Sequence, residues 1–246
     1  MTQYRMALKL PASTRLRPEW AYRLYGALLE SAPEEFGKQV HRQGVTPVSQ
    51  FLEVSPEGAP CWVVSLLSPE SEEALSPVLE CRERFSLRRE PREILIVERK
   101  KRQLPSPEGL LLEGAVIKNR FRLEFCTATA FKSAGEYQIL PTVRLVLQSL
   151  ILKWNGCFPE CPIEDEDGEG LEALCAGLVC RDFSLRSAEY PLKGVNLPGF
   201  VGEMVLENHL KGFHRELANA LLLFSGWSGI GMKTALGMGG IRCRPL

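Results

Sequence analysis

Two kinds of apolar periodicity alternate along the chain, and their order restricts the fold more than any other feature of the sequence. Tyr4–Leu10 places apolar residues at every second position, which is typical of a half-buried strand. Glu19–Ser31, after Pro18, places Trp20 and other apolar residues every three or four positions, which predicts an amphipathic helix. The succession of these patterns therefore predicts the topology.

The same order of elements is predicted twice. In the first half, strands are predicted at Tyr4–Leu10, Val48–Val54, Cys61–Leu67, Phe85–Arg89 and Ile94–Glu98, and helices at Glu19–Ser31, from Pro33 to His41, and at Ser68–Leu79. In the second half, strands are predicted at Phe121–Ala128, Leu178–Leu185, Phe200–Leu206 and Gly237–Cys243, and helices at Pro141–Trp154 and Lys211–Phe224. Leu104–Gly114 holds two prolines and two glycines, which favours a connection between the halves.

The main elements of each half thus read strand, helix, strand, strand, helix, strand. Two such units predict an α+β protein of two tandem ferredoxin-like (βαββαβ, RRM-like) domains. We place the first domain at residues 1–108 and the second at residues 109–246. The halves share this order without visible sequence identity, so the pattern supports a fold class and no particular function.

The charges cancel in total but are segregated along the chain. The 30 basic and 30 acidic residues give no net charge. Residues 160–172 hold seven acidic residues and no basic one, whereas residues 84–102 hold eight basic and three acidic residues. A neutral protein with such segregation can still present basic faces to a polyanion, although a solvated strand edge explains the basic run equally well.

We expect a cytoplasmic protein without a membrane partner. The longest apolar runs are too short to span a bilayer, and Arg5 and Lys9 interrupt the N-terminal pattern, unlike in a signal peptide. A disulfide framework is therefore not expected among the eight cysteines. The pairs Cys157/Cys161 and Cys175/Cys180 loosely resemble zinc ligand pairs, but buried or incidental thiols are the favoured interpretation. No metal and no cofactor are predicted.

A glycine-rich segment near the C-terminus is the strongest candidate for binding. Between Gly226 and Gly240 six glycines surround Lys233 and Thr234, so the backbone can approach a ligand closely and offer N–H groups to an anion. Met232 stands where a nucleotide-binding P-loop requires glycine, and the segment follows a helix rather than a strand. The alternative is a turn that only links the last helix to the last strand.

The spacing of this segment resembles a known motif. Gly229-Ile-Gly231, five residues, then Gly237-Met-Gly239 is similar to the glycine-rich motif of the RAMP superfamily, and more narrowly to the CRISPR-associated endoribonuclease that cuts precursor repeat RNA into guide RNAs. The similarity extends over four further segments of the second half: Thr127–Thr129, Tyr137–Pro141, Leu145–Asn155 and Gly199–Gly202. In the first half it is weaker and covers Tyr25–Leu52.

The resemblance implies the chemistry and the residues that carry it. It implies metal-independent cleavage by the ribose 2′-hydroxyl, which leaves a 2′,3′-cyclic phosphate and a 5′-hydroxyl. His41 matches the catalytic histidine, and Tyr25 matches a tyrosine that accompanies it in some members. Those members also use a lysine after the histidine; this chain has none between Lys38 and Lys100, so Arg42 is the nearby cation. An arginine stabilises a phosphorane but does not exchange protons.

The resemblance also implies the partners. RNA is expected to be a CRISPR repeat with a stem-loop, recognised by shape, and subunits of a CRISPR effector complex or a second copy of the chain are possible further partners. The RNA-binding residues are then Gly229, Gly231, Lys233, Thr234, Gly237, Gly239 and Arg242. We expect Lys233→Glu or Gly231→Val to weaken RNA binding in a protein that stays folded. The alternative function is a non-cleaving RAMP subunit that binds guide RNA in an effector complex, which the missing lysine would favour.

Overall fold

The chain forms two compact units in a computed structural model that describes residues 1–11, 14–40, 46–55, 57–87 and 93–246. The first unit comprises residues 1–104 together with Tyr190–Leu197 and Lys233–Met238. The second comprises Pro105–Glu189, Pro198–Met232 and residues 239–246. Two short segments from late in the sequence therefore belong to the first unit, and the domain boundary at residue 108 stays a prediction.

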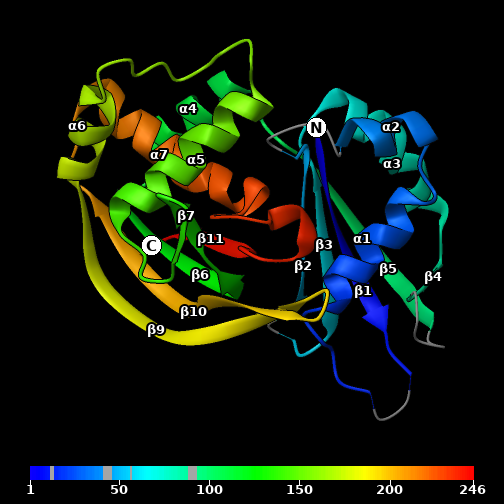
Figure 1. The fold of residues 1–246 in the computed structure, drawn as a ribbon. Coiled ribbons are helices and arrows are strands. Elements are labelled where there is room, and N and C mark those ends of the chain that lie inside the picture. The colour runs from blue at the N-terminus through cyan, green and yellow to red at the C-terminus, as the bar shows by residue number, and fades with distance from the viewer. Residues whose placement is uncertain (12–13, 41–45, 56, 88–92) are drawn as a thin grey trace. The chain divides into compact units, whose positions relative to one another are not determined.

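The first unit is built on a five-stranded antiparallel sheet in the order β2-β3-β1-β5-β4 (Figure 1). Its strands are β1 (Thr2–Lys9), β2 (Val48–Val54), β3 (Pro60–Leu66), β4 (Arg84–Ser86) and β5 (Glu93–Gln103). Without the short edge strand β4, the order is β2-β3-β1-β5. This is the strand order of a ferredoxin-like βαββαβ unit, with β5 as its fourth strand.

Three helices belong to this unit: α1 (Trp20–Leu29), α2 (Glu34–Val40) and α3 (Pro69–Cys81). The apolar face of α1 is fully buried, with Trp20, Leu24 and Leu28 inaccessible to solvent, and it shares one core with the inward residues Met6 and Trp62 of the sheet. Strand side chains alternate between the two faces of a sheet, so the period-two pattern of the sequence supplies this core.

The second unit has a four-stranded sheet in the order β11-β6-β10-β9. Its strands are β6 (Arg120–Thr129), β9 (Leu178–Leu192), β10 (Val195–Asn208) and β11 (Ile241–Pro245). A small separate sheet pairs β7 (Phe131–Ser133) with β8 (Glu136–Gln138). The four-strand order again equals that of a ferredoxin-like unit, so the prediction of two such folds is confirmed.

The strands β9 and β10 are longer than the sequence predicts. Lys193 and Gly194 join them in a two-residue turn with positive φ values of 52° and 85°. Positive φ at both central residues fits the twist of a tight hairpin. The tip of this hairpin, Tyr190–Leu197, is the part that belongs to the first unit.

The helices of the second unit are α4 (Pro107–Val116), α5 (Val143–Cys157), α6 (Glu169–Gly177) and α7 (Gly212–Ser228). Trp154 and Phe158 at the end of α5 each pack against Phe224 of α7 with ring centroids 5.6 Å apart, and against each other at 4.9 Å. None of the helices in the described part of the chain has both the length and the apolar character needed to cross a bilayer.

The prediction that Leu104–Gly114 is a connection is wrong, because most of it forms α4. The Ser106 side chain accepts the N–H of Gly109 at the start of this helix. At Gly114 a Cβ would stand 2.6 Å from the backbone oxygen of Glu216, so the glycine allows α4 and α7 to pack closely. The Arg215 guanidinium also donates to the backbone oxygens of Ala115 and Ile117. Pro107 at the first helical position suits a helix start, so tertiary contacts offset mainly the two glycines inside it.

Candidate nucleic-acid interface

The first part of the glycine-rich segment packs closely against its own unit. After α7, the N–H of Gly231 donates to Oγ of Ser149 over 2.8 Å, and the N–H of Met232 donates to the backbone oxygen of Ala130 over 2.9 Å. Gly231 has a φ of +81°, and a Cβ there would stand 2.4 Å from the Ala130 oxygen. Both the backbone angle and the close approach therefore require glycine.

The last part of the segment is held in the same way. The N–H of Gly239 donates to the backbone oxygen of Ala128, and its carbonyl accepts from the N–H of Ile230. The next amide, at Gly240, donates to Oγ1 of Thr127 over 2.9 Å. Since the amides of residues 229–232 and 239–240 all donate within the protein, the expected row of free N–H groups is not formed by these residues.

The middle of the segment, Lys233–Met238, belongs to the first unit. Lys233 is left-handed with a φ of +57°, and its carbonyl accepts the N–H of Leu236 over 2.9 Å at the end of a single 3-10 turn. A Cβ on Gly237 would stand 2.3 Å from Oη of Tyr190 and 2.5 Å from Cβ of Ala21. Close packing therefore explains the glycine at position 237. The Lys233 side chain is partly exposed.

Gln50 anchors this middle part from the centre of the first unit. Its Nε2 donates to the backbone oxygens of Ala235 and Ala21, over 2.9 and 3.1 Å. Its Oε1 accepts the indole N–H of Trp62 over 2.8 Å. The Gln50 side chain is fully buried, so breaking any of these bonds would leave a buried polar group without a partner, and the bonds hold the turn in place. A glutamine within the apolar pattern of β2 is the signal in the sequence that the prediction missed.

Tyr190, at the hairpin tip, is the second anchor. Its hydroxyl lies 2.6 Å from the backbone oxygen of Leu236 and 3.1 Å from that of Pro18. Burial raises the pKa of the Tyr190 phenol, which therefore remains a neutral hydrogen-bond donor. The phenol joins three segments of the first unit: the approach to α1, the hairpin tip and the turn after Lys233.

These three segments each carry a cation. Arg17 directly precedes Pro18 and is exposed, and Lys193 is exposed at the hairpin turn, with Nζ 5.4 Å from the ring centroid of Tyr22. Lys233 lies at the start of the third segment. We call Arg17, Lys193 and Lys233 the basic triad. Exposed or partly exposed cations of this kind are the side chains that bind the phosphates of a nucleic acid.

The remaining predicted binding residues are less available. Thr234 is buried, with 8% of its surface exposed. Arg242 lies opposite Glu124 in the pairing of β11 with β6, and its guanidinium is 2.8 Å from the Glu124 carboxylate. A guanidinium already paired with a carboxylate offers less of its charge to a phosphate. The role of both residues in RNA binding stays a prediction.

The basic run of residues 84–102 is largely occupied by contacts within the protein. Its five described basic residues have partners as follows: Arg84 with Glu93, Arg99 with the backbone oxygen of Leu79, Lys100 with Glu98, Lys101 with Glu80, and Arg102 with Gln3. Arg88, Arg89 and Arg92 lie outside the described residues. The described part of the run therefore fits a solvated strand edge better than a dedicated RNA-binding surface.

Of the predicted catalytic residues, the structure describes Tyr25. It lies on α1 in the core of the first unit, with 4% of its surface exposed, and burial raises the pKa of its phenol. The hydroxyl is buried, and it has no hydrogen-bond partner among the described residues. His41 and Arg42 lie outside the described residues, so whether Tyr25 and His41 meet stays a prediction.

The other two histidines and six of the eight cysteines belong to the second unit; buried Cys61 and exposed Cys81 belong to the first. His209 is exposed, with Nε2 2.8 Å from the Arg181 guanidinium, and His214 is exposed at the start of α7. Among the described residues, no three histidine, cysteine or acidic side chains are grouped closely enough to hold a metal ion. Cys157 is buried, which raises the pKa of its thiol to about 12.

Comparisons with known proteins give one consistent result. Residues 123–241 match the model of the family described as CRISPR-associated endoribonuclease Cas6. The Cas6 endoribonuclease of Mycobacterium tuberculosis H37Rv is 30% identical over 230 residues, which cover 91% of this chain and 71% of that protein. The enzyme of Streptococcus thermophilus is 29% identical over 224 residues, or 90% of both chains.

Solved structures resemble the chain over its full length. A Cas6 product complex superimposes with a TM-score of 0.77 at 26% identity, covering 99% of this chain and 100% of the other. Cas6 of Thermus thermophilus superimposes with a TM-score of 0.69 at 23% identity, covering 99% of this chain and 98% of the other. Both support the tandem ferredoxin-like fold.

Proposed function

Because the chain belongs to the Cas6 family of CRISPR-associated endoribonucleases, we propose that it cuts CRISPR repeat RNA without a metal, by attack of a ribose 2′-hydroxyl. That it is an endoribonuclease which processes precursor CRISPR RNA rests on 30% identity over 91% of the chain. The non-cleaving alternative is not favoured, because the family and the curated relatives are all named as endoribonucleases.

The proposed reaction is a transesterification. The 2′-oxygen next to the scissile phosphate loses its proton and bonds to phosphorus, and the 5′-oxygen of the next nucleotide leaves and takes up a proton. The products are a 2′,3′-cyclic phosphate and a 5′-hydroxyl. Such a reaction needs a base, an acid and a cation or hydrogen-bond donors for the crowded phosphorane.

We assign the proton transfer to His41, because an imidazole titrates near neutral pH. Arg42, the next residue, supplies a permanent charge for the phosphorane. Tyr25 is suited to donate a hydrogen bond and not to act as a base, because its raised pKa keeps the phenol neutral. Its buried hydroxyl lacks a partner among the described residues, which supports a polar role in addition to packing.

Binding is assigned to side chains more than to the glycine backbone. The amides of residues 229–232 and 239–240 are used within the protein, so the glycines shape the segment and position Lys233. The basic triad then holds phosphates, with Gln50 and Tyr190 fixing the turn that presents it. Recognition of a repeat stem-loop by shape, association with effector subunits, a homodimer and a cytoplasmic location stay predictions.

One cleavage assay tests the proposed chemistry. The full chain is incubated with its own repeat RNA in EDTA, alongside RNA with a single deoxyribose before the cut. We expect cleavage in EDTA, a cyclic phosphate on the upstream product, and no cleavage but unchanged binding of the deoxy substrate. Loss of cleavage in EDTA without loss of folding contradicts the metal-independent mechanism, and cleavage of the deoxy substrate contradicts the nucleophile.

A further inference from the structure

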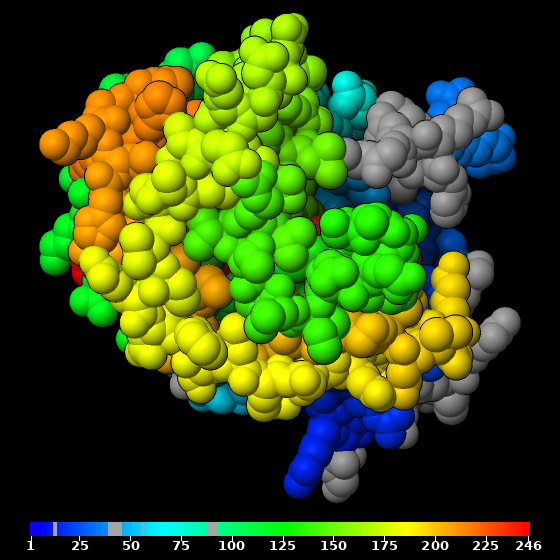
Figure 2. Space-filling view, turned by 60° about the vertical axis from the view of Figure 1, so that its left-hand side comes forward, coloured from blue at the N-terminus to red at the C-terminus, as the bar shows by residue number. Residues whose placement is uncertain are grey.

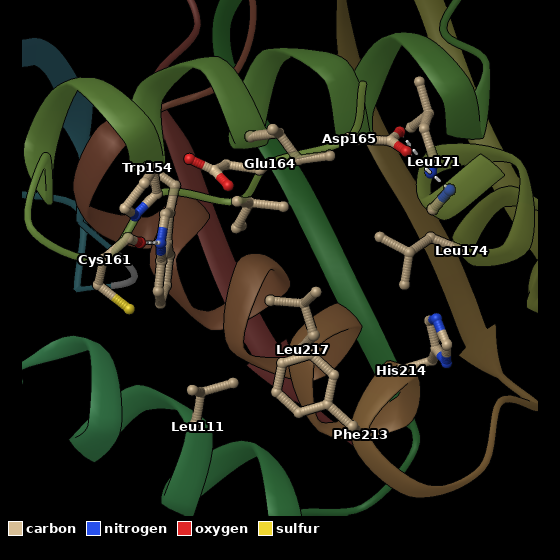
Figure 3. Close-up of a pocket in the computed structure, with 14 residues that line it drawn as sticks. Leu111, Trp154, Cys161, Glu164, Asp165, Leu171, Leu174, Phe213, His214 and Leu217 are labelled. Carbon is tan, nitrogen blue, oxygen red and sulfur yellow. Dashed lines mark hydrogen bonds between the residues drawn. The ribbon is translucent and has the colours of Figure 1, made fainter. Parts of the chain in front are cut away.

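A preformed apolar pocket lies in the second unit, on elements that the proposed function does not use. Its volume is about 310 Å³, and its lining comes from α4, α5, α6, α7 and the acidic segment before α6 (Figure 3). Leu111, Ile151, Leu174, Phe213 and Leu217 are among its apolar lining residues. Pockets that hold small-molecule ligands begin at about 300 Å³.

Hydrogen bonds fix the acidic wall of this pocket. The indole N–H of Trp154 donates to the backbone oxygen of Cys161 over 3.0 Å. The side-chain amide of Asn155 makes two bonds to the backbone of Ile163, over 2.8 and 3.0 Å. The carboxylate of Asp165 accepts the N–H groups at the start of α6, including that of Leu171 (Figure 3). The pocket is therefore a built feature of the fold and not a gap beside a loose loop.

One large aromatic side chain of the pocket lining remains exposed. This side chain, Phe213, is 60% exposed. Leu112 on α4 and Leu152 on α5 are also exposed, at 70% and 62%, on two of the helices that supply the lining. An exposed aromatic side chain at a concave apolar site is typical of a surface that another molecule covers.

The segment of residues 160–172, which we call the rim, is strongly acidic, and its residues Glu164 and Asp165 line the pocket. Five carboxylates have no ion pair among the described residues: Glu160, Glu164, Glu166, Asp167 and Glu169. A sixth, Glu172, pairs with Arg144. Figure 2 shows residues 158–172, in yellow-green, next to the orange start of α7. Within a screening length of about 8–10 Å, these charges repel phosphates and attract cations.

We propose that this pocket docks a segment of another protein, which inserts one large apolar side chain and carries lysine or arginine on either side of it. The pocket and Phe213 bind the apolar group, and the unpaired carboxylates select the flanking cations. RNA does not suit this rim, because its phosphates would be repelled by several carboxylates that have no ion pair in the described part of the chain. The site therefore gives the enzyme a protein-binding face separate from the basic triad.

The test uses random peptides displayed on phage, selected against the full-length protein after depletion on Phe213→Ser. A synthetic consensus peptide is then titrated by calorimetry into the wild type, Phe213→Ser and Glu164→Lys. The matched controls are Phe183→Ser and Asp182→Lys, since Phe183 is 65% exposed on β9 and Asp182 is also exposed without an ion pair among the described residues. Melting curves and analytical ultracentrifugation accompany each variant.

We expect a consensus with a large apolar residue flanked by basic ones. Phe213→Ser should weaken its binding about tenfold or more, as for the loss of one buried aromatic contact. Glu164→Lys should weaken it several-fold, with less effect at high salt, and the controls should bind like the wild type. No enriched peptide, or a consensus without basic residues, overturns the proposal.

Two further outcomes assign the pocket to another occupant and overturn the proposal. A dimer that Phe213→Ser converts to a monomer would make a second copy of the chain the occupant. A loss of repeat-RNA affinity in Phe213→Ser, but not in Phe183→Ser, would make RNA the occupant. Glu164→Lys keeps the test decisive should Phe213→Ser fold poorly, because Glu164 is exposed and its carboxylate makes no bond within the described structure.

Discussion

Gly231 provides the most quantitative test of how the glycine-rich segment is held. Gly231→Ala adds a Cβ at a φ of +81°, where it would stand 2.4 Å from the Ala130 oxygen. The matched control is Gly135→Ala, because Gly135 has a φ of +87° and nothing within 4 Å of an added Cβ. Both variants place an alanine in a left-handed backbone conformation, which is unfavourable. Only in Gly231→Ala does the new Cβ clash with a backbone atom.

The magnitudes follow from these two environments. The left-handed conformation costs a non-glycine residue about 1–2 kcal/mol, and both variants share this cost. Displacement of the Ala130 carbonyl weakens its 2.9 Å bond from Met232, worth about 1 kcal/mol, and forces packed neighbours to shift for about 1–3 kcal/mol more. Gly231→Ala should therefore be less stable than Gly135→Ala by about 3 kcal/mol. In a chain of this length this difference lowers Tm by about 6–12 °C.

Differential scanning calorimetry of the two variants and the wild type measures the difference. Should the two units unfold in separate transitions, the shift belongs to the one that contains Gly231. Equal Tm values for Gly231→Ala and Gly135→Ala would refute the account of close packing. The structure also revises the expectation for Gly231→Val: its larger side chain should destabilise the fold, so this variant does not isolate RNA binding.

Three further outcomes are expected. Lys233→Glu should weaken repeat-RNA binding and reduce the slope of log K against log salt by about 0.7–0.9, whereas the exposed Lys118→Glu should do neither in filter-binding titrations. His41→Ala should slow single-turnover cleavage about a hundredfold or more with little change in affinity, and cleavage at the wild-type rate would disprove its role. Burial lowers the pKa of Lys153 to about 7. Below that pH the buried amine is charged and destabilises the fold most, and this destabilisation decreases as the pH rises toward the ordinary lysine pKa. Urea unfolding should show stability rising from pH 7 to about 8.5, where thiols begin to titrate, and this rise should be smaller in Lys153→Met.

Apolar periodicity by itself determined most of the architecture. The alternation in Tyr4–Leu10 and the helical pattern of Glu19–Ser31 depend on which face of an element is buried, a property that nearby residues already encode. The order of such elements then restricted the topology to two ferredoxin-like units. The glycine spacing from Gly229 to Gly239 pointed to the family, since a backbone that approaches its neighbours closely tolerates few side chains.

Tertiary structure decided what local sequence could not. The segment Pro107–Val116 became a helix because α7 packs on Gly114 and Arg215 binds its last carbonyls, contacts about a hundred residues away. The amides around Gly231 and Gly239 turned inward because carbonyls of residues 128–130 lie next to them, which glycine content alone cannot reveal. Whether a polar group faces a ligand or the protein depends on distant partners, and these are fixed only when the whole chain has folded.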